Sequence, residues 1–445
     1  MRHGGAGECG WAVFRQTLPR DPGNPYEEER PTSIPMVTPA AIREAALLLL
    51  GKIIRTPLVY SPTFSGMTGA EVYLKLEAMQ KAGSFKVRGA ANRILSQREG
   101  IGNQGVIAAS AGNHAQGVAV AAGIAGAPAT IVMPVWVSPG KQEAAAGYGA
   151  RIILNGSTLQ ESIDHAMNLA AERSMTFIHP YNDEAVIAGQ GTIGLEILED
   201  LPDTGSIVVP VGGGGLIAGI ATAVKAIRPD IRIIGVQAAA CPSAAAARET
   251  GGPATVTAHP TIADGIRVTR TGDLTWPAIR DLVDTIVLVD EAAMVNAISA
   301  LLERKKVLAE GAGAAPLAAL LSGAVTPAPG EKIVLVISGG NVDAFLLERI
   351  IRKGLYDSGR VLQCTFEIEE GVRALPHLLS LVAAEGGTIS RVEQERITPD
   401  LPLHLIRVTL EIEVRGPRHG RRVMAALETA GYPMKVPIQG TGTHP

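Results

Sequence analysis

Four consecutive glycines at residues 212–215 constrain the fold more strongly than any other feature of this sequence. They follow an apolar run at residues 206–211 and precede an alanine-rich apolar run that continues to about residue 227. We interpret this order as a buried strand, a tight turn and a helix, because glycine lets the backbone turn closely. The bare amides of such a turn, together with the positive end of the helix dipole, favour a phosphate monoester as ligand.

The same strand–turn–helix order recurs along the chain. Strands are predicted at residues 72–76, 105–109, 129–134, 151–154, 206–211, 231–237 and 333–337, and helices at 39–50, 89–98, 114–122, 141–148 and 216–227. Short apolar strands that alternate with helices are typical of an α/β protein whose parallel sheet is covered on both faces. In such sheets ligands bind beyond the carboxyl ends of the strands, so several of the turns that follow can converge on one site.

The pattern changes near residue 355. Strands are predicted at residues 361–368, 388–396, 404–415 and 433–436, with helices at 373–385 and 418–429. This βαββαβ order predicts a ferredoxin-like α+β module. We therefore expect four parts: a flexible N-terminal arm (1–34), an α/β domain (35–354) with a small subdomain inserted at about 75–180, a linker (354–359) and a C-terminal domain (360–440).

Composition excludes several classes of protein. The chain has 40 basic and 43 acidic residues, and a formal net charge of −3 argues against a nucleic-acid partner. No apolar run approaches the roughly 20 residues that span a membrane, and residues 1–34 lack the apolar core of a signal peptide. Cys9, Cys241 and Cys364 are scattered, without disulfide or metal-ligand spacing. We expect a reducing, cytoplasmic location.

Lys86 stands among small residues at 84–90 (SFKVRGA), shortly after the predicted strand at 72–76. A lysine in this position is most often a solvated side chain at the start of a helix. A recessed lysine together with a phosphate-binding turn instead suggests pyridoxal 5'-phosphate held as a Schiff base. An apolar setting favours the neutral amine, which is the form that condenses with an aldehyde.

Two other functions stay open. A dinucleotide fits Gly213, Gly215 and Ala218, which match the G-x-G-x-x-A fingerprint, but that fingerprint also needs Asp or Glu at the end of the next strand. That strand ends in Gln237, so a nicotinamide oxidoreductase is the weaker alternative. A non-catalytic amino-acid sensor on the same scaffold is the other alternative, although every motif position is chemically intact.

Four stretches in this order resemble the threonine dehydratase (threonine ammonia-lyase) family of pyridoxal phosphate enzymes, which has the tryptophan synthase β-subunit type of fold. They are residues 84–90, 110–117 (SAGNHAQG), 212–215 and 338–341 (SGGN). The resemblance spans residues 38–350 and implies two parallel-sheet subdomains. It also implies β-elimination of water from L-threonine and L-serine, after which the released aminoacrylate hydrolyses to 2-oxobutanoate or pyruvate and ammonia.

The resemblance implies a role for each motif residue. Lys86 would carry the Schiff base and move the Cα proton, Phe85 would lie against the cofactor ring, and Asn113 would bond the ring's 3-oxygen. Ser338 would face the pyridine nitrogen, where a neutral hydroxyl makes the ring a weaker electron sink than a carboxylate does. The phosphate would be held by Gly212, Gly213, Gly214, Gly215 and Leu216. The substrate carboxylate would be bound by Ser110, Gly112, Asn113 and His114.

Serine racemases share the fold and most of these motifs, so a racemase is the alternative within the family. They need a second acid or base, which in those relatives is a serine beside the Gly-Asn-His, where this chain has Ala111. They also resemble one another in a carboxylate-bearing loop for a divalent cation. The matching positions here are Gln237, Cys241 and Ser243, which carry no carboxylate, so we expect no divalent metal.

Three further titratable residues have open roles. Glu310 would contact the ring or a monovalent ion, or would be an ordinary surface or capping glutamate. His114, at a helix start, and His179, before a proline, occupy positions where histidine more often forms a structural hydrogen bond than acts as a base.

The C-terminal module resembles an ACT domain, through its βαββαβ order and the stretch at residues 397–403. The resemblance implies allosteric binding of an amino acid such as isoleucine or valine, a place in isoleucine biosynthesis, and pairing of subunits into a homodimer or homotetramer. A module that only pairs subunits, and an enzyme of amino-acid breakdown, remain open.

Overall fold

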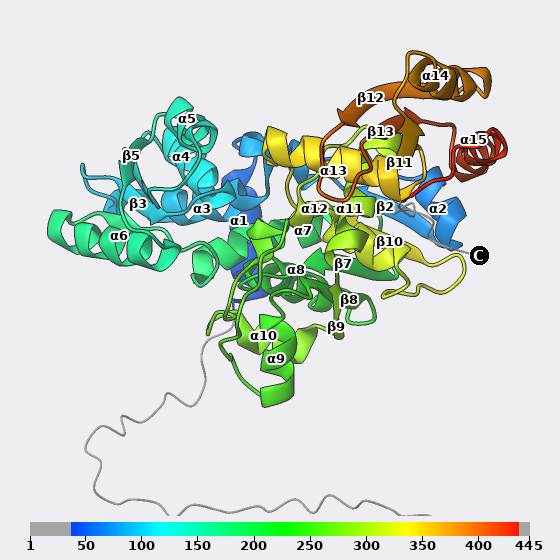
Figure 1. Ribbon diagram of the computed structural model, residues 1–445. Coiled ribbons are helices and arrows are strands. Elements are labelled where there is room, and N and C mark those ends of the chain that lie inside the picture. The colour runs from blue at the N-terminus through cyan, green and yellow to red at the C-terminus, as the bar shows by residue number, and fades with distance from the viewer. Residues whose placement is uncertain (1–36, 436–445) are drawn as a thin grey trace, which may run out of the picture. The chain divides into compact units, whose positions relative to one another are not determined.

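The computed structural model describes residues 37–435, so the expected N-terminal arm and Cys9 lie outside the described residues. Its strands form two parallel sheets and one antiparallel sheet (Figure 1). Helix α1 (Pro39–Leu49) begins as the sequence predicts, because the Thr38 hydroxyl accepts a hydrogen bond from the amide of Ala41 and proline occupies the first helical position.

The larger sheet has six strands in the order β1-β2-β10-β7-β8-β9. They are β1 (Leu58–Tyr60), β2 (Glu71–Lys75), β10 (Lys332–Val336), β7 (Ser206–Pro210), β8 (Arg232–Ala238) and β9 (Thr285–Val289). All neighbours are parallel except β1, which pairs antiparallel with β2 at one edge. Because β10 lies between β2 and β7, the segments that follow these three strands begin side by side. Those segments carry Lys86, Ser338 and the glycine turn.

Alternate residues of β10 pack on opposite faces of this sheet. Ile333 and Leu335 join the core formed with helices α11 (Glu291–Ala300) and α12 (Gly311–Leu321). Val334 and Val336 join the core formed with α7 (Glu184–Asp200), α8 (Gly215–Lys225) and α10 (Trp276–Leu282). Short helices α2 (Pro62–Thr68) and α9 (Ser243–Thr250) complete this part of the chain. Helices on both faces make the strands apolar throughout, as in other parallel sheets.

The smaller sheet has four parallel strands in the order β5-β4-β3-β6. Its strands, β3 (Val106–Ala109), β4 (Ala129–Met133), β5 (Arg151–Leu154) and β6 (Thr176–Phe177), lie between β2 and β7 in the sequence. One face packs on α3 (Lys86–Ser96) and α4 (Asn113–Ala125), the other on α6 (Leu159–Arg173), and α5 (Pro139–Gly147) precedes β5. Helix α3 starts three residues before the predicted start at residue 89, so Lys86 is its first residue.

The C-terminal sheet is antiparallel, in the order β11-β13-β12. Its elements are β11 (Val361–Glu369), α14 (Ala374–Ala384), β12 (Thr388–Glu395), β13 (Leu405–Glu413) and α15 (Pro417–Thr429). The predicted strand at 433–436 is wrong for the described residues: only an isolated bridge joins Met434 to Phe366, and residue 436 is not described. The segment predicted as a linker is helical over most of its length, because α13 (Ala344–Asp357), capped by Asp343, continues to Asp357.

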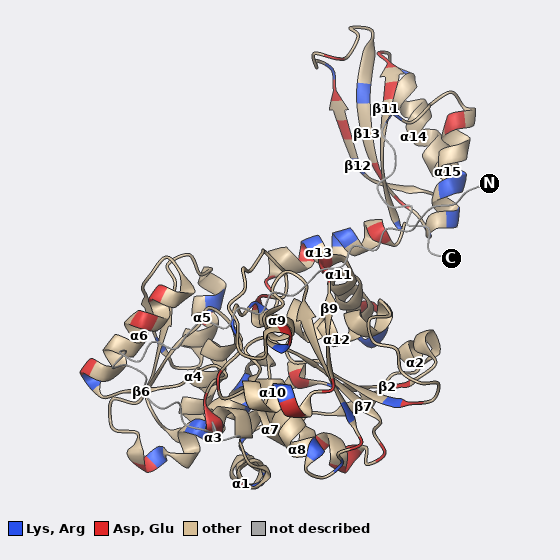
Figure 2. Cartoon of the chain, turned by 90° about the horizontal axis from the view of Figure 1, so that it is seen from below, with Lys and Arg blue, Asp and Glu red and all other residues tan. Residues whose placement is uncertain are grey.

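Charged residues of both signs are mixed on the surface elements. Figure 2 shows α13 carrying blue and red segments along its length, so no single-sign face runs along this helix. None of the helices in the described part of the chain is both long and apolar enough to cross a membrane. Cys241 and Cys364 are free thiols, and both are buried.

Candidate active site

Lys86 is partly buried, and its amine is held by the main chain of another segment. Its Nζ donates a hydrogen bond to the carbonyl oxygen of Pro180 at 2.9 Å and lies 5.2 Å from the centre of the Phe85 ring. Loss of hydration lowers the pKa of Lys86 to about 8, while Glu310, when ionised, acts in the opposite direction. This lowered pKa makes the neutral amine far more populated near neutral pH than in an ordinary lysine, and the neutral form is the one that acts as a nucleophile or a base.

The residues just before Lys86 run alongside the segment that follows β10. The amide of Phe85 donates to the carbonyl oxygen of Ser338 at 3.1 Å, and Ser84 forms an antiparallel bridge with Gly339. Ser338 is buried, with 2% of its surface exposed. Lys86 and Ser338 therefore lie at the same end of the large sheet.

The glycine turn meets this site through Tyr181, the neighbour of Pro180. A Cβ atom at Gly213 would come within 2.4 Å of the Tyr181 ring, and one at Gly215 would come within 3.0 Å of the Tyr181 side chain. Gly214 has φ +95°, a backbone conformation that favours glycine. Close packing against Tyr181 and this positive φ explain why the turn needs glycine.

The amides of the turn are available to an anion. No backbone hydrogen bond to another described residue occupies the amides of Gly212, Gly213 and Gly214. Gly215 and Leu216 are the first two residues of α8, where amides have no partner within the helix. Leu216 offers its main-chain amide but not its side chain, because the side chain packs in the core. Together with the Lys86 amine, these groups fit a cofactor that has a phosphate at one end and an aldehyde at the other.

Both the nitrogen and the oxygen of the Asn113 side-chain amide form hydrogen bonds, and Asn113 is the first residue of α4. Its Nδ2 donates to Glu310 Oε1 at 2.6 Å, and its Oδ1 accepts from Asn341 Nδ2 at 2.7 Å. Glu310 is 4% exposed, and burial, assisted by the charge of Asp264, raises the pKa of its carboxyl to about 8. Glu310 is therefore a buried site residue, which excludes the sequence-based alternative of a surface glutamate.

The turn after β3 carries the other predicted substrate residues. The Ser110 hydroxyl accepts a hydrogen bond from the amide of Gly112 at 3.2 Å. The Nε2 atom of His114 lies 2.8 Å from the carbonyl oxygen of Ile178, and because a carbonyl only accepts, this nitrogen carries the hydrogen. Burial, reinforced by the charge of Lys86, lowers the pKa of His114 to about 3. His114 is thus a neutral, structural hydrogen-bond donor.

His179 shapes the turn that presents Pro180 to Lys86. Its Nδ1 accepts hydrogen bonds from the amides of Tyr181 at 3.2 Å and Asn182 at 2.8 Å. Burial lowers the pKa of His179 to about 4, so the ring stays neutral and Nδ1 stays an acceptor. The structural interpretation of this histidine is confirmed.

Sequence reasoning missed several residues of the site. No motif marked the contacts of Pro180 with Lys86 and of Tyr181 with the glycine turn. The Thr275 hydroxyl, which donates to the carbonyl oxygen of Gly213 at 2.7 Å, was also missed. Asn341 is part of the SGGN stretch, but nothing in the stretch assigns its partner. The only available signal was the position of Pro180 and Tyr181 just after a short strand.

Gln237 has a structural task at the end of β8. Its Oε1 accepts from the amides of Ala244 at 2.8 Å and Ala245 at 3.0 Å, so it caps the start of α9. Its Nε2 donates to the carbonyl oxygen of Val211 and to the Ser243 hydroxyl. Within residues 37–435, no three His, Cys, Asp or Glu side chains gather closely enough to hold a metal ion.

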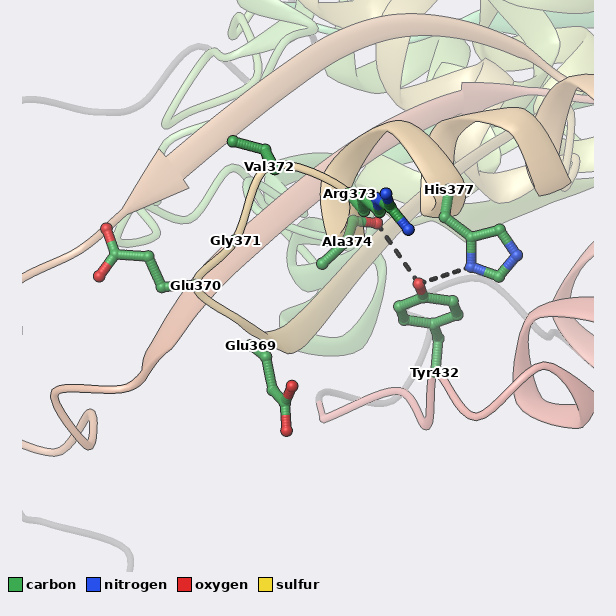
Figure 3. A pocket seen from close by; sticks show the side chains of 8 residues that line it. All are labelled: Glu369, Glu370, Gly371, Val372, Arg373, Ala374, His377 and Tyr432. Carbon is green, nitrogen blue, oxygen red and sulfur yellow. Dashed lines mark hydrogen bonds between the residues drawn. The ribbon is translucent and has the colours of Figure 1, made fainter.

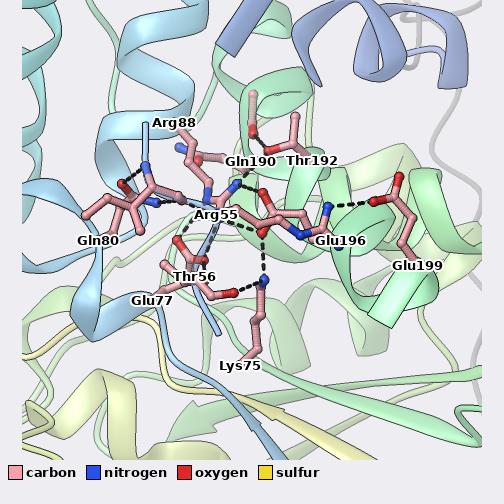
Figure 4. A network of polar contacts seen from close by, with 12 residues as sticks. Arg55, Thr56, Lys75, Glu77, Gln80, Arg88, Gln190, Thr192, Glu196 and Glu199 are labelled. Atoms are coloured by element: carbon pink, nitrogen blue, oxygen red, sulfur yellow. Dashed lines mark hydrogen bonds and ion pairs between the residues drawn. The ribbon is translucent and has the colours of Figure 1, made fainter. Parts of the chain in front are cut away.

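Arg88, two residues after Lys86, is fully buried in a network of charges (Figure 4). Its guanidinium pairs with Glu77 at 2.7 Å and with Glu196 at 2.6 Å, and Lys75 pairs with Glu196 at 2.6 Å. These ion pairs join α3 to α7 and to the end of β2. The network therefore fixes the first turn of α3, which carries Lys86.

Comparison with known proteins agrees with this site. A family model described as pyridoxal-phosphate dependent enzyme matches residues 49–339. An L-threonine ammonia-lyase of Thermotoga maritima is 44% identical over 401 residues, which cover 90% of this chain and 100% of that protein. The solved structure of maize serine racemase is 39% identical with TM-score 0.68, and covers 72% of this chain and 98% of its own. The solved threonine deaminase of T.th. is 40% identical with TM-score 0.65, and covers 69% of this chain and 99% of its own.

The matched range contains Lys86, the glycine turn and Ser338, the three features that the order of β2, β10 and β7 brings together. The predicted fold class, with two parallel-sheet subdomains of the tryptophan synthase β-like type, is confirmed, and the antiparallel C-terminal sheet is consistent with a ferredoxin-like module. The chain belongs to the pyridoxal-phosphate dependent enzyme family.

Proposed function

We propose that this protein is an L-threonine ammonia-lyase. It would remove water from L-threonine, and also from L-serine, and hydrolysis of the released enamine would then give 2-oxobutanoate or pyruvate and ammonia. One observation carries the proposal: Lys86, the bare amides at residues 212–216 and Ser338 meet at one end of the sheet, in a chain 44% identical over nearly all its length to an L-threonine ammonia-lyase.

Different residues of the chain would bind the cofactor and move the proton. When bound, pyridoxal phosphate draws electrons from the Cα atom of the substrate and so weakens the bonds to that atom. Lys86 would hold the aldehyde end of the cofactor and would take the Cα proton, since its lowered pKa makes the neutral amine more available. The glycine amides at the start of α8 would hold the phosphate. Ser338 would be the neutral partner of the ring nitrogen, and Phe85 would lie against the ring.

The substrate carboxylate binds at the turn before α4. The Ser110 hydroxyl and the main-chain amides at the start of α4 lie at the positive end of a helix, and Gly112 supports the turn by donating its amide to Ser110. His114 stabilises this turn through its hydrogen bond to the carbonyl oxygen of Ile178 and does not exchange a proton with the substrate. Asn113 would direct its remaining N–H to the 3-oxygen of the cofactor.

The proposal is tested by incubating the purified protein with pyridoxal phosphate and L-threonine or L-serine. We expect a visible absorption band from the bound cofactor, formation of the 2-oxo acid and equal amounts of ammonia. Borohydride treatment should attach the cofactor to the peptide that contains Lys86. A protein with the visible band but no 2-oxo acid product would contradict the lyase, and a protein without the band would contradict the cofactor site.

A serine racemase is the second candidate, because the maize enzyme has a similar structure. Ala111, beside Gly112, carries a methyl group that cannot deliver a proton to the face of Cα opposite Lys86. We therefore expect L-serine to give pyruvate with almost no D-serine. Chiral chromatography of the same reaction mixture distinguishes the two activities, because D-serine formed faster than pyruvate would favour the racemase.

We also propose that the C-terminal module binds an amino-acid effector. A cavity of approximately 450 Å³ lies where β11 ends and α14 begins (Figure 3). It is lined by Glu369, Glu370, Gly371, Val372, Arg373, Ala374, His377 and Tyr432. Acidic side chains and an arginine in one cavity suit the ammonium and carboxylate groups of an amino acid. The His377 Nδ1 and Tyr432 hydroxyl lie 2.9 Å apart and form one wall.

Arg373→Ala tests the effector site. We expect isoleucine or valine to change the threonine activity of the unaltered protein, and Arg373→Ala to abolish this response while basal activity stays the same. Arg391→Ala, an exposed change on β12, serves as the control. Inhibition by isoleucine would support isoleucine biosynthesis, and a flat activity curve with each amino acid would overturn the effector proposal.

Light scattering of the same preparation tests the expected homodimer or homotetramer.

A further inference from the structure

We infer that Asn341 is a positioning residue for the proposed lyase: its single side-chain amide fixes both the turn before Lys86 and the orientation of Asn113. The inference rests on the proposed function, which assigns Lys86 and Asn113 to the cofactor. Asn341 comes from the segment after β10, whereas Asn113 begins α4 on the smaller sheet. Asn341 therefore connects parts of the site that no local sequence pattern connects.

The turn before Lys86 has an unfavourable backbone. Ala82 has φ +59° and Gly83 has φ +68°, and a left-handed conformation is unfavourable for alanine because of its Cβ atom. Asn341 Nδ2 donates to the carbonyl oxygen of Ala82 at 2.8 Å, and the amide of Gly340 donates to the carbonyl oxygen of Gly83 at 3.0 Å. These two bonds stabilise the turn in the form that delivers Lys86 to the start of α3.

The same nitrogen also bonds Asn113. Asn341 Nδ2 donates its second hydrogen to Asn113 Oδ1 at 2.7 Å, and Asn113 Nδ2 donates to Glu310 at 2.6 Å. If the Asn113 amide were reversed, two NH₂ groups would face each other, and neither can accept a hydrogen bond. Asn341 therefore keeps the NH₂ group of Asn113 on the side of Glu310, with one N–H left for another acceptor.

Asn341 itself has only one orientation available. Reversal of its amide would place Oδ1 against two acceptors, the Ala82 carbonyl and Asn113 Oδ1. Its Oδ1 atom packs against Gly83, where a Cβ atom would come within 2.5 Å. The chain of bonds from Ala82 through Asn341 and Asn113 to Glu310 thus has a fixed direction, and that direction makes Asn113 a donor toward the cofactor.

Two variants separate this role from simple packing. Asn341→Ala removes both hydrogen bonds, whereas Asn341→Asp keeps the size of the side chain but sets a carboxylate against two acceptor oxygens. Asn168→Asp, on the exposed surface of α6, adds the same charge away from the site and is the matched control. Circular dichroism reports whether each variant is folded, and Asn341→Ser replaces Asn341→Ala if the alanine variant is not.

The test is titration of the cofactor-free protein with pyridoxal phosphate, followed by the visible spectrum and by kinetics with threonine. We expect Asn341→Ala to weaken cofactor affinity about tenfold, the usual cost of losing one strong hydrogen bond. Asn341→Asp should weaken the affinity further. The spectrum of the bound cofactor should shift, kcat should fall more than KM rises, and Asn168→Asp should match the unaltered protein.

A double variant supplies the decisive comparison. If Asn341 acts partly through Asn113, the loss of affinity in the double variant Asn113→Ala with Asn341→Ala should be clearly smaller than the sum of the two single losses. Fully additive losses, or an unchanged affinity and spectrum for Asn341→Ala, would overturn the inference. If the unaltered protein binds the cofactor but makes no 2-oxo acid, the proposed lyase fails, and the affinity measurements still decide the role of Asn341.

Discussion

Arginine–glutamate ion pairs occur both around Lys86 and in the C-terminal module, but they are buried in the first region and exposed to solvent in the second. The side chains of Arg88 and Glu77 are 0% exposed, whereas those of Arg396 and Glu370 are 64% and 48% exposed. Removing one partner of a buried pair leaves a charge without water or counter-ion, while an exposed partner is simply hydrated. The first region therefore uses charge to fix a geometry, whereas the charges of the second stay hydrated and constrain the fold little.

Lysine replacement should show the largest contrast. Lys86→Ala removes the amine that the proposed mechanism requires, so we expect threonine turnover below detection with an unchanged circular dichroism spectrum. Lys435→Ala removes an exposed lysine that pairs with Glu367 at 3.0 Å in the C-terminal module. Full activity is expected there, measured as 2-oxo acid formation. Turnover retained by Lys86→Ala would remove this residue from the mechanism.

Arginine replacement tests the comparison directly. Arg88→Met leaves Glu77 and Glu196 without their buried partner, and we expect the free energy of unfolding to fall by about 3–5 kcal/mol. Arg396→Met breaks an exposed pair and should change stability too little to measure. Urea unfolding of both variants gives the two values. Equal losses would show that burial does not distinguish these pairs.

The smallest expected effect concerns pH. Burial raises the pKa of Glu310 to about 8, so between its ordinary value near 4.5 and about 8 the folded protein holds a proton that the unfolded chain has released. Stability contributed by this group is therefore present at low pH and is lost as pH rises through that window. Glu310→Gln keeps the acceptor for Asn113 but does not titrate.

The measurement is urea unfolding of the cofactor-free protein and of Glu310→Gln at pH 5 and pH 8. We expect the unaltered protein to lose stability relative to the variant as pH rises. A constant difference between the two proteins across this range would show that Glu310 does not carry the expected proton.

Local patterns predicted much of the fold. Strands such as β7 and β10 were predictable because short apolar runs end in glycine or polar turns, and α1 because Thr38 and Pro39 mark its start. Where the structure differs from these patterns, the causes are local as well. The predicted linker was helical because Asp343 caps a long amphipathic helix that tolerates Gly354. The last predicted strand forms only one bridge to β11 in the described residues.

The sequence by itself determined which chemical groups are present: a lysine in a small-residue turn, a row of glycine amides before a helix, and a serine after a buried strand. Only the tertiary structure decided which groups touch them. Pro180, Glu310 and Asn341 come from segments far apart in the chain, and they meet because β10 pairs between β2 and β7 while the smaller sheet packs beside them. Strand order depends on long-range packing, which no window of neighbouring residues contains.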